Sequence, residues 1–295
     1  MPETVVCNLC RNADPEPQPQ IGAFLGVPDP FSLVRCGSCG LFFLSPRATL
    51  EELGTMYANH PYYAADNAFR GETRQAFYDA KINRLERYVP GRGRVLGIGC
   101  LEGGYALQVA QDRGWQVLAI EFSPILTDHV RAHLRVPVEC VAGWDLSGKP
   151  SSSFDAVYTH SFEHLPDPRA TLRECRRLLR PGGHIMLEVP HEIGSLKQQM
   201  KRLALRVIGE RVRRHFVSNV GPEFHLYYFD PNTLTAVVRS EGFEVVELRT
   251  YMRGHPVYYG SQELQWLREL IYATGALVKR GPCIEVIARA TPSPG

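Results

Sequence analysis

The feature that most constrains the fold is a glycine-rich turn in the stretch Val95-Leu-Gly-Ile-Gly-Cys-Leu-Glu-Gly-Gly-Tyr105. The aliphatic residues before the turn predict a strand, and the apolar spacing after it predicts a helix. A turn of this kind at the carboxyl end of a strand usually cradles a nucleotide. The stretch therefore predicts an α/β domain that holds a nucleotide-like ligand at this turn.

Strand and helix patterns alternate from Arg94 onward. The expected strands cover residues 95–98, 116–120, 138–141, 156–159, 184–189, 243–250 and 283–290. The clearest helical patterns between them cover residues 170–179 and 231–240. Several of the strands are near-continuous apolar runs, which is typical of strands covered on both faces. We expect an open, mostly parallel sheet, with the last strand antiparallel.

Glu121 ends the second expected strand, about 20 residues beyond the turn, where a carboxylate can accept both hydroxyls of a ribose. NAD and S-adenosylmethionine are both bound in this way. A dinucleotide turn needs a third glycine at position 102, which here is Glu102. S-adenosylmethionine has no phosphate, and its turn is looser, so the residues favour S-adenosylmethionine.

Five motifs, in order over about 200 residues, together resemble the class I S-adenosylmethionine-dependent methyltransferases. They are Leu96-Gly-Ile-Gly-Cys-Leu-Glu-Gly103, Ile120-Glu-Phe-Ser-Pro124, Ser153-Phe-Asp-Ala-Val157, His160-Ser-Phe-Glu-His-Leu-Pro-Asp-Pro168 and Leu179-Arg-Pro-Gly-Gly183. The family's first motif is similar to Leu-Asp-Ile-Gly-Cys-Gly-x-Gly. This chain departs from it twice, with Gly97 at the acid and Leu101 at the middle glycine. The resemblance implies a Rossmann-like methyltransferase sheet and extends to bacterial enzymes that methylate sugars or other biosynthetic intermediates.

The resemblance also implies a role for each residue of the cofactor site. The turn residues Gly97, Gly99, Cys100, Leu101 and Gly103 let the methionine part of the cofactor approach the backbone. Glu121 then binds the ribose, and Phe122, Trp144 and Asp145 surround the adenine and its amino group. His160 and Ser161 line the methionine end. Ordinary core packing is the alternative for both aromatic residues.

The reaction needs an acceptor held in line with the activated methyl group, and a base assists it. Histidine is the residue most easily poised as a base near neutral pH. His160, His164 and His225 are the candidates, and His225 with the neighbouring Tyr227 and Tyr228 is the leading set on the substrate side. For each histidine the alternative is a structural role. The Glu163-His164 pair also leaves open a divalent ion, as in some related O-methyltransferases.

Four cysteines form two Cys-x-x-Cys pairs, Cys7/Cys10 and Cys36/Cys39. Four thiolates at this spacing predict a structural Zn²⁺ site with no coordination position left for chemistry. Disulfides or a redox pair are the alternatives, and the lack of a secretory signal and of a surrounding βαβ pattern disfavours them. We expect a small zinc-ribbon module over residues 1–46, with a hairpin built from residues 24–34 between the pairs.

The rest of the chain is expected to form a helical linker or cap over residues 47–90 and a methyltransferase domain over residues 91–295. Residues 191–228 interrupt that domain as an insert that we interpret as a substrate lid. It contains an amphipathic basic helix that starts at Leu196. An anionic substrate, a membrane surface or RNA are the other interpretations of this helix.

The formal net charge of +2 gives no overall electrostatic case for nucleic acid or membranes. We find no long apolar run and expect a cytoplasmic enzyme with a small-molecule acceptor, a bound S-adenosylmethionine and a structural Zn²⁺. RNA methylation is one alternative, and it is disfavoured because aromatic and basic residues are not interleaved. A cofactor-dead binding protein with this fold is the other. The sequence does not indicate the oligomeric state.

Overall fold

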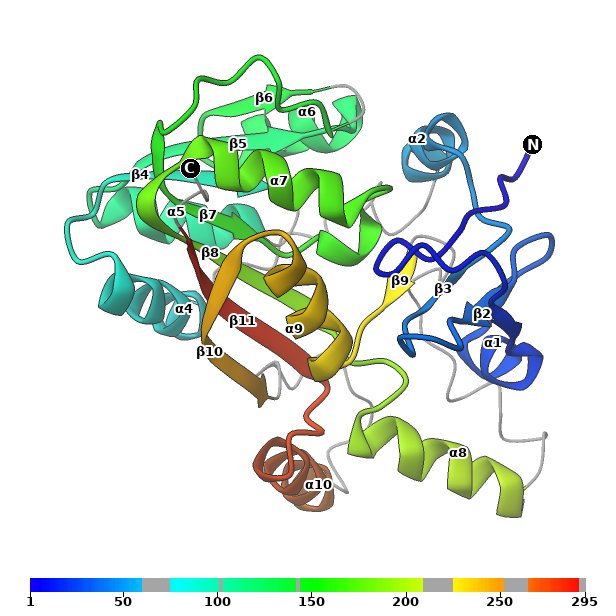
Figure 1. Ribbon diagram of the computed structural model, residues 1–295. Helices are drawn as coiled ribbons and strands as arrows, with labels where there is room; N and C mark the ends of the chain where they lie inside the picture. Colours follow the sequence, from blue (N-terminus) through cyan, green and yellow to red (C-terminus); the bar gives the residue numbers. More distant parts are fainter. Residues whose placement is uncertain (60–74, 101–102, 142–143, 209–224, 252–264, 292–295) are drawn as a thin grey trace. The chain divides into compact units, whose positions relative to one another are not determined.

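The computed structural model describes residues 1–59, 75–100, 103–141, 144–208, 225–251 and 265–291 (Figure 1). Contacts divide the chain into two compact units. The first unit comprises Met1–Thr49, Val189–Ala236 and Leu248–Glu285, and the second comprises Leu50–Glu188, Val237–Glu247 and Val286–Gly295. Each unit is therefore assembled from segments that are far apart in sequence.

A seven-stranded sheet has the order β10-β11-β8-β7-β4-β5-β6 (Figure 1). Its strands are β4 (Arg94–Ile98), β5 (Gln116–Glu121), β6 (Val138–Cys140), β7 (Phe154–Thr159), β8 (Leu179–Pro190), β10 (Phe243–Tyr251) and β11 (Cys283–Ala290). The four pairings β4 with β5, β4 with β7, β5 with β6, and β7 with β8 are all parallel. One strand of the sheet runs antiparallel. The expected mostly parallel α/β sheet is confirmed. The strand ends lie within two residues of those predicted, except that β8 begins at Leu179, five residues before the predicted start.

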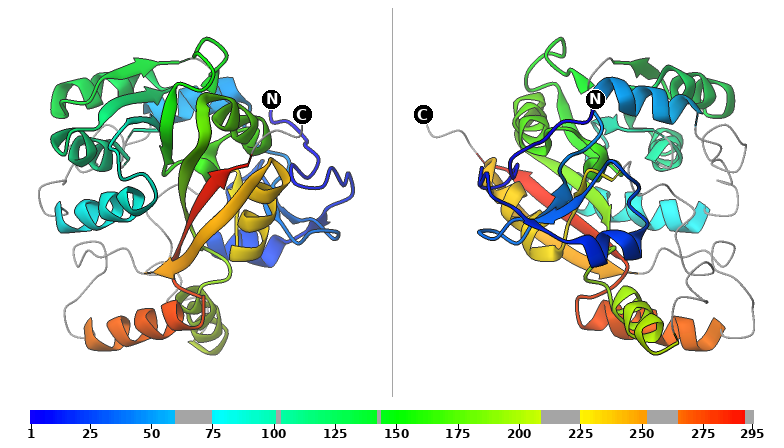
Figure 2. Two further views of the ribbon diagram at one scale, coloured as in Figure 1. Left: turned by 60° about the vertical axis from the view of Figure 1, so that its left-hand side comes forward. Right: turned by 90° about the vertical axis from the view of Figure 1, so that its right-hand side faces the viewer.

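Helices cover this sheet. In chain order they are α4 (Gln75–Tyr88), α5 (Gly103–Asp112), α6 (Pro124–His133), α7 (Pro168–Leu178) and α9 (Pro231–Ser240), and the second unit also contains α2 (Leu50–Asn59) and the short helix η4 (Phe162–His164). Helices α4 and α5 pack together on one face, and α7 lies on the other (Figures 1 and 2). The core of the α4 and α5 face includes Ile82, Leu107 and Trp115, all nearly inaccessible to solvent. Coverage on both faces explains why the strands are apolar throughout.

Helix α7 shows how local sequence sets these boundaries. Asp167 accepts a hydrogen bond from the amide of Ala170 (2.9 Å) and Pro168 occupies the first turn, so the helix starts at a capped position. Leu172, Cys175 and Leu178 recur at a spacing of three residues and are buried. The apolar stripe therefore fixes which side of the helix faces the sheet.

In the first unit a four-stranded sheet has the order β1-β2-β3-β9. Its strands are β1 (Glu16–Pro17), β2 (Leu33–Arg35), β3 (Phe42–Leu44) and β9 (Tyr227–Tyr228). The unit also contains α1 (Pro19–Leu25), α8 (Leu196–Ile208) and α10 (Gln265–Leu277). Strand β9 lies beside β3 (Figure 1) and pairs with it antiparallel, with Tyr227 opposite Phe43 and Tyr228 opposite Phe42. Residues almost 200 positions apart thus share one small sheet.

The prediction of a hairpin within residues 24–34 is wrong. Phe24 and Leu25 end helix α1, which begins with Pro19 and stops at Gly26 in a left-handed conformation (φ 84°). A proline at the start and a glycine just past the end are helix signals that outweigh the apolar residues between them. Strand β2 pairs with β1 and β3 instead.

Among the described residues, no helix combines the length and the apolar character that crossing a membrane requires.

Candidate active site

The glycine turn leaves β4 at Gly99, in the second unit. Gly99 has a φ of +76°, and its amide donates to the carbonyl of Ile120 at the end of β5 (3.0 Å). A Cβ atom at this position would lie 2.2 Å from Oγ of Ser161. Only glycine satisfies both the backbone conformation and the space, and the turn is therefore held close to two neighbouring strands.

Glu121, the last residue of β5, accepts hydrogen bonds from the backbone of this turn and from the two residues that follow Glu121 in the chain. Its Oε2 accepts a hydrogen bond from the amide of Cys100 (3.0 Å), and its Oε1 accepts from the amides of Phe122 (2.9 Å) and Ser123 (3.2 Å). The side chain is fully buried, so desolvation raises the pKa of the carboxyl group, and the three amide donors oppose that shift. A carboxylate at this position therefore organises the turn in addition to any contact with a ligand.

Of the two departures from the family's first motif, Gly97 and Leu101, the structure describes the surroundings of Gly97 only. A Cβ atom at Gly97 would lie 2.2 Å from Cδ1 of Leu107, a buried residue of α5. The space that an acidic side chain would need is therefore filled by leucine. Leu101 lies outside the described residues, together with Glu102, and Gly103 begins helix α5. Cys100 is buried and donates its thiol to the carbonyl of Ile120 (3.2 Å).

The residues expected around the adenine lie together after β5 and β6. The rings of Phe122 and Trp144 are in contact, with centroids 4.9 Å apart and planes tilted by 37°. A flat ring between them would need a separation of about 7 Å, twice the usual contact distance. An adenine can therefore stack beside this pair, or between the two rings only after they separate. Asp145 is exposed, and its Oδ1 accepts from the amide of Ser147 (2.9 Å).

His160 and Ser161 follow the last residue of β7. His160 forms a hydrogen bond through Nε2 to Oε1 of Glu188 (3.2 Å), and its side chain is 14% exposed. Because a carboxylate only accepts, Nε2 carries a proton, and in the neutral imidazole Nδ1 is then the basic nitrogen. His164, in helix η4, has its Nε2 3.6 Å from Oε1 of the buried Glu163. Both histidines lie in the second unit with the glycine turn.

His225 lies in the first unit, just before β9. Its Nδ1 is 2.8 Å from Oε2 of Glu192, so it too is oriented by a carboxylate. His191 has a structural role instead. It donates through Nδ1 to the carbonyl of Gly281 (3.0 Å) and is buried, and burial lowers its pKa.

The four cysteines of the two pairs come together in the first unit. All four Sγ atoms lie within 4.8 Å of one another. Cys7 and Cys39 are 3.5 Å apart, and Cys10 and Cys36 are 3.4 Å apart, so none of these pairs is a disulfide. A Zn²⁺ with four sulfur ligands places them about 3.8 Å apart, because each Zn–S bond is about 2.3 Å. The donor set and its spacing therefore fit a tetrahedral zinc site.

The two knuckles share one backbone geometry. Arg11 and Gly40 each follow the second cysteine of a pair, with φ of 63° and 79°, and each amide returns to the carbonyl of the first cysteine (both 2.9 Å). Burial raises the pKa of Cys7 to about 11. For Cys36 burial acts in the same direction, but hydrogen bonds from the Cys39 amide and the Cys10 thiol outweigh it and lower its pKa to about 6. Two turns with the same backbone hydrogen bond therefore bring the four sulfur atoms together around one possible metal position.

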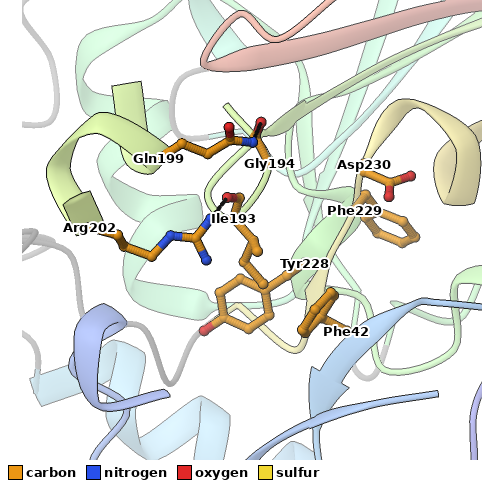
Figure 3. Close-up of a pocket in the computed structure, with 8 residues that line it drawn as sticks. All are labelled: Phe42, Ile193, Gly194, Gln199, Arg202, Tyr228, Phe229 and Asp230. Atoms are coloured by element: carbon orange, nitrogen blue, oxygen red, sulfur yellow. Dashed lines mark hydrogen bonds between the residues drawn. The ribbon is translucent and has the colours of Figure 1, made fainter. Parts of the chain in front are cut away.

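A pocket of about 220 Å³ lies within the first unit (Figure 3). Its lining residues are Phe42, Ile193, Gly194, Gln199, Arg202, Tyr228, Phe229 and Asp230. Arg202 donates through Nη2 to the carbonyl of Ile193 (2.9 Å), and its guanidinium lies 5.9 Å from the ring of Phe24. Gln199 donates to the carbonyl of Gly194 (3.0 Å). Aromatic rings and one guanidinium group therefore line a space the size of a single-ring molecule.

Two carboxylates that orient histidines, Glu188 and Glu192, were not anticipated from the sequence. They lie on either side of the end of β8. A charged residue inside the apolar run Ile-Met-Leu-Glu-Val was the available signal for Glu188. Glu192 stands in a polar loop, where nothing in the sequence separates it from an ordinary surface residue.

Comparison with known proteins gives a consistent result. Residues 70–248 match a family model described as a methyltransferase domain. The chain is 32% identical over 172 residues to a ubiquinone biosynthesis O-methyltransferase from Xanthomonas axonopodis pv. citri, covering 55% of this chain and 67% of that protein. The protein of the same name from Xanthomonas oryzae pv. oryzae is 32% identical over 165 residues, with 52% and 64% covered.

Among solved structures, that of the cyclase SpnF aligns with a TM-score of 0.52 and 20% identity, covering 83% of this chain and 98% of SpnF. That likeness concerns the fold alone, because one fold hosts different reactions. The chain spans about two thirds of the length of the two O-methyltransferases. The four-cysteine segment lies outside the residues that match the family model.

Proposed function

This chain belongs to the family of S-adenosylmethionine-dependent methyltransferases, and from that premise we propose that it methylates a hydroxyl oxygen of a small biosynthetic molecule. The observation that carries the proposal is the glycine turn closed by Glu121, within a chain segment that matches the family model. The preference for oxygen rests on the two O-methyltransferases to which the chain is similar.

The turn residues fit the cofactor. Gly99 keeps the backbone open where a side chain would clash, and Gly103 starts the next helix. In the proposed site these residues and Ser161 hold the methionine portion, and Glu121 binds the ribose. Phe122, Trp144 and Asp145 contact the adenine. Bound there, S-adenosylmethionine supplies a methyl group already activated by its sulfonium.

The protein's own contribution is orientation and proton transfer. Holding the acceptor in line with the methyl group is worth up to about 7–11 kcal/mol. A positioned base adds about 10²–10⁴ in rate. His160, His164 and His225 remain the candidate bases, and in each case a carboxylate lies beside the imidazole.

We assign acceptor recognition to the pocket of the first unit. Most of its lining residues come from the expected insert, residues 191–228. Its rings suit a planar acceptor, and Arg202 suits a carboxylate or phosphate on that acceptor. Arg202→Met should raise KM for an anionic acceptor at least about tenfold with kcat little changed, because a charge-assisted hydrogen bond is lost. The exposed Arg239 provides the control variant, Arg239→Met. A KM that does not change would remove the pocket from the acceptor site.

The four-cysteine cluster is proposed to hold a structural Zn²⁺. With four sulfur ligands the ion has no open position, so it stabilises the first unit and takes no part in the reaction.

The decisive experiment has two steps. Calorimetric titration with S-adenosylmethionine and with its demethylated product should give micromolar affinities. Transfer of tritium-labelled methyl groups is then measured to protocatechuate, to UDP-glucose and to an RNA oligonucleotide. Ether formation on either small molecule supports the proposal. Methylation of the RNA alone, with affinity that falls steeply with salt, would replace it with RNA methylation. The absence of cofactor binding at millimolar ligand would indicate a binding protein.

A further inference from the structure

The second unit contains an ion pair that is almost completely inaccessible to solvent. Lys81 of α4 contacts Oε2 of Glu188 on β8, and the two side chains are 1% and 0% exposed. The ammonium group also lies 4.8 Å from the centroid of the Phe77 ring. Burying two charges is costly, and well-packed apolar residues would often stabilise a fold as well or better. The pair is therefore better explained by the side chain that it positions than by a contribution to the stability of the fold.

The strand register shows what Glu188 holds. Thr159 of β7 is paired with Leu187 of β8, so the next residues, His160 and Glu188, are cross-strand neighbours. Oε1 of Glu188 accepts from Nε2 of His160 (3.2 Å), while its Oε2 faces Lys81. One carboxylate thus bridges a buried cation and an imidazole.

The same register connects His160 to the glycine turn. Ile98 of β4 is paired with Thr159 of β7, so Gly99 and His160 follow neighbouring strands at the same edge of the sheet. Ser161, the next residue, occupies the space directly beside Gly99. Of the candidate bases, His160 is therefore the one whose chain position is tied directly to the turn.

We propose that Glu188 is a positioning residue that holds His160 as the base of the methyl transfer, and that Lys81 fixes Glu188 in its charged form. This inference rests on the proposed function. The acceptor oxygen forms a bond to the methyl carbon while the carbon–sulfur bond breaks, and its electron pair stays on sulfur. The hydroxyl proton moves to Nδ1 of His160, and the resulting imidazolium is stabilised by the Glu188 carboxylate.

The test uses variants that do not strand a buried charge. Lys81→Met and Glu188→Met are combined, so that both charges are removed together and the volume is kept. Arg84→Met with Glu247→Met is the matched control, because Arg84 also lies on α4 and forms an ion pair with Glu247 on β10 (2.6 Å). His160→Asn gives the full contribution of the base.

Nitrogen NMR of the histidine side chains provides a readout that does not depend on activity. In the natural protein His160 should be the tautomer protonated at Nε2, and this preference should be lost in the Lys81/Glu188 double variant but kept in the control. With an acceptor found as above, the double variant should lower kcat about 10²-fold with KM and cofactor affinity within about twofold. Adding His160→Asn to it should lower kcat no further than His160→Asn alone.

The outcomes separate failure of the positioning role of Glu188 from failure of the proposed methyltransferase function. A double variant that folds and keeps both the His160 tautomer and kcat would overturn the positioning role. A lost tautomer with unchanged kcat would leave Glu188 orienting a histidine that is not the base, and this also rejects the inference. Failure of the natural protein to methylate any hydroxylated acceptor would instead count against the proposed function, while the tautomer result would still report on Glu188.

Discussion

At the scale of single residues, the cofactor turn is decided by sterics and by one carboxylate. Gly99 is required by its positive φ and by the Ser161 side chain beside it. Gly97 is required because Leu107 fills the adjoining space. Glu121 accepts a hydrogen bond from the amide of Cys100, so this amide has a carboxylate partner without an acid at position 97.

Gly99→Ala should lower the free energy of unfolding through backbone strain and through a clash with Ser161, whereas Gly114→Ala should lower it through backbone strain alone. Gly114 also has a positive φ (94°), but a Cβ atom at this position would meet no other atom within 4 Å. The control should cost about 1–2 kcal/mol of unfolding free energy from backbone strain alone. Gly99→Ala should cost more and abolish cofactor binding, as measured by urea unfolding and calorimetry. Equal costs for the two variants would contradict the steric argument.

Glu121→Ala should weaken S-adenosylmethionine binding by about 1.5–3 kcal/mol, because a charged hydrogen-bond partner is lost. The turn should also lose its contact with the Cys100 amide. Calorimetry on the variant and on Glu139→Ala, an exposed acid on β6, separates this effect from a general loss of charge. Unchanged affinity for Glu121→Ala would remove Glu121 from the ribose site.

At the scale of elements, the N-terminal module is completed by a distant strand. Leu44 donates its amide to the carbonyl of Leu226 (3.0 Å), and Arg47 donates to the hydroxyl of Tyr227 (3.0 Å) in a buried hydrogen bond. The cysteine turn at Cys36 leads directly into β3, the partner of β9. The module and the segment that carries His225 therefore form one folded piece.

Cys36→Ser should lower the zinc content from about one ion per chain to near zero, because four ligands are needed for a closed site. Residues 1–46 should then become sensitive to proteolysis, whereas cofactor affinity should change by less than about twofold, since the turn lies in the second unit. The exposed Cys140→Ser is the control. Full zinc content in the Cys36 variant would contradict the four-thiolate site.

At the scale of the whole molecule, each unit buries a histidine that resists protonation. Burial lowers the pKa of His184, helped by repulsion from Arg289, and burial also lowers the pKa of His191. The unfolded chain therefore takes up protons below the ordinary value of 6.5 more readily than the folded protein. Both histidines therefore contribute to the free energy of unfolding above pH 6.5, and this contribution is lost as the pH falls through the lowered pKa that each has in the folded protein.

The free energy of unfolding should consequently decrease between about pH 7.5 and about pH 5.5, as followed by urea titration. Glu121 acts in the opposite direction, because burial raises its pKa and its cost is relieved only at lower pH. His191→Gln should flatten the pH dependence, and His133→Gln, at an exposed position on α6, is the control variant. An equal slope in the His191 variant would show that other groups set the pH response.

The sequence by itself determined the features that depend on neighbouring residues. Strand periodicity, the Asp167 cap and the glycine turn are local patterns, and so are the two cysteine knuckles. The parallel sheet follows from such patterns because strands alternating with helices have few ways to pack. Even helix α1, which was missed, has its proline and glycine signals in the sequence.

Only the tertiary structure decided which distant residues meet. The ion pair of Lys81 with Glu188, and the bond from Glu188 to His160, depend on the register of β7 and β8 and on the packing of α4. The pairing of β3 with β9 likewise joins residues that no local pattern relates. A charged side chain looks the same in sequence whether it faces water or a buried partner, and the difference arises from the burial that folding imposes.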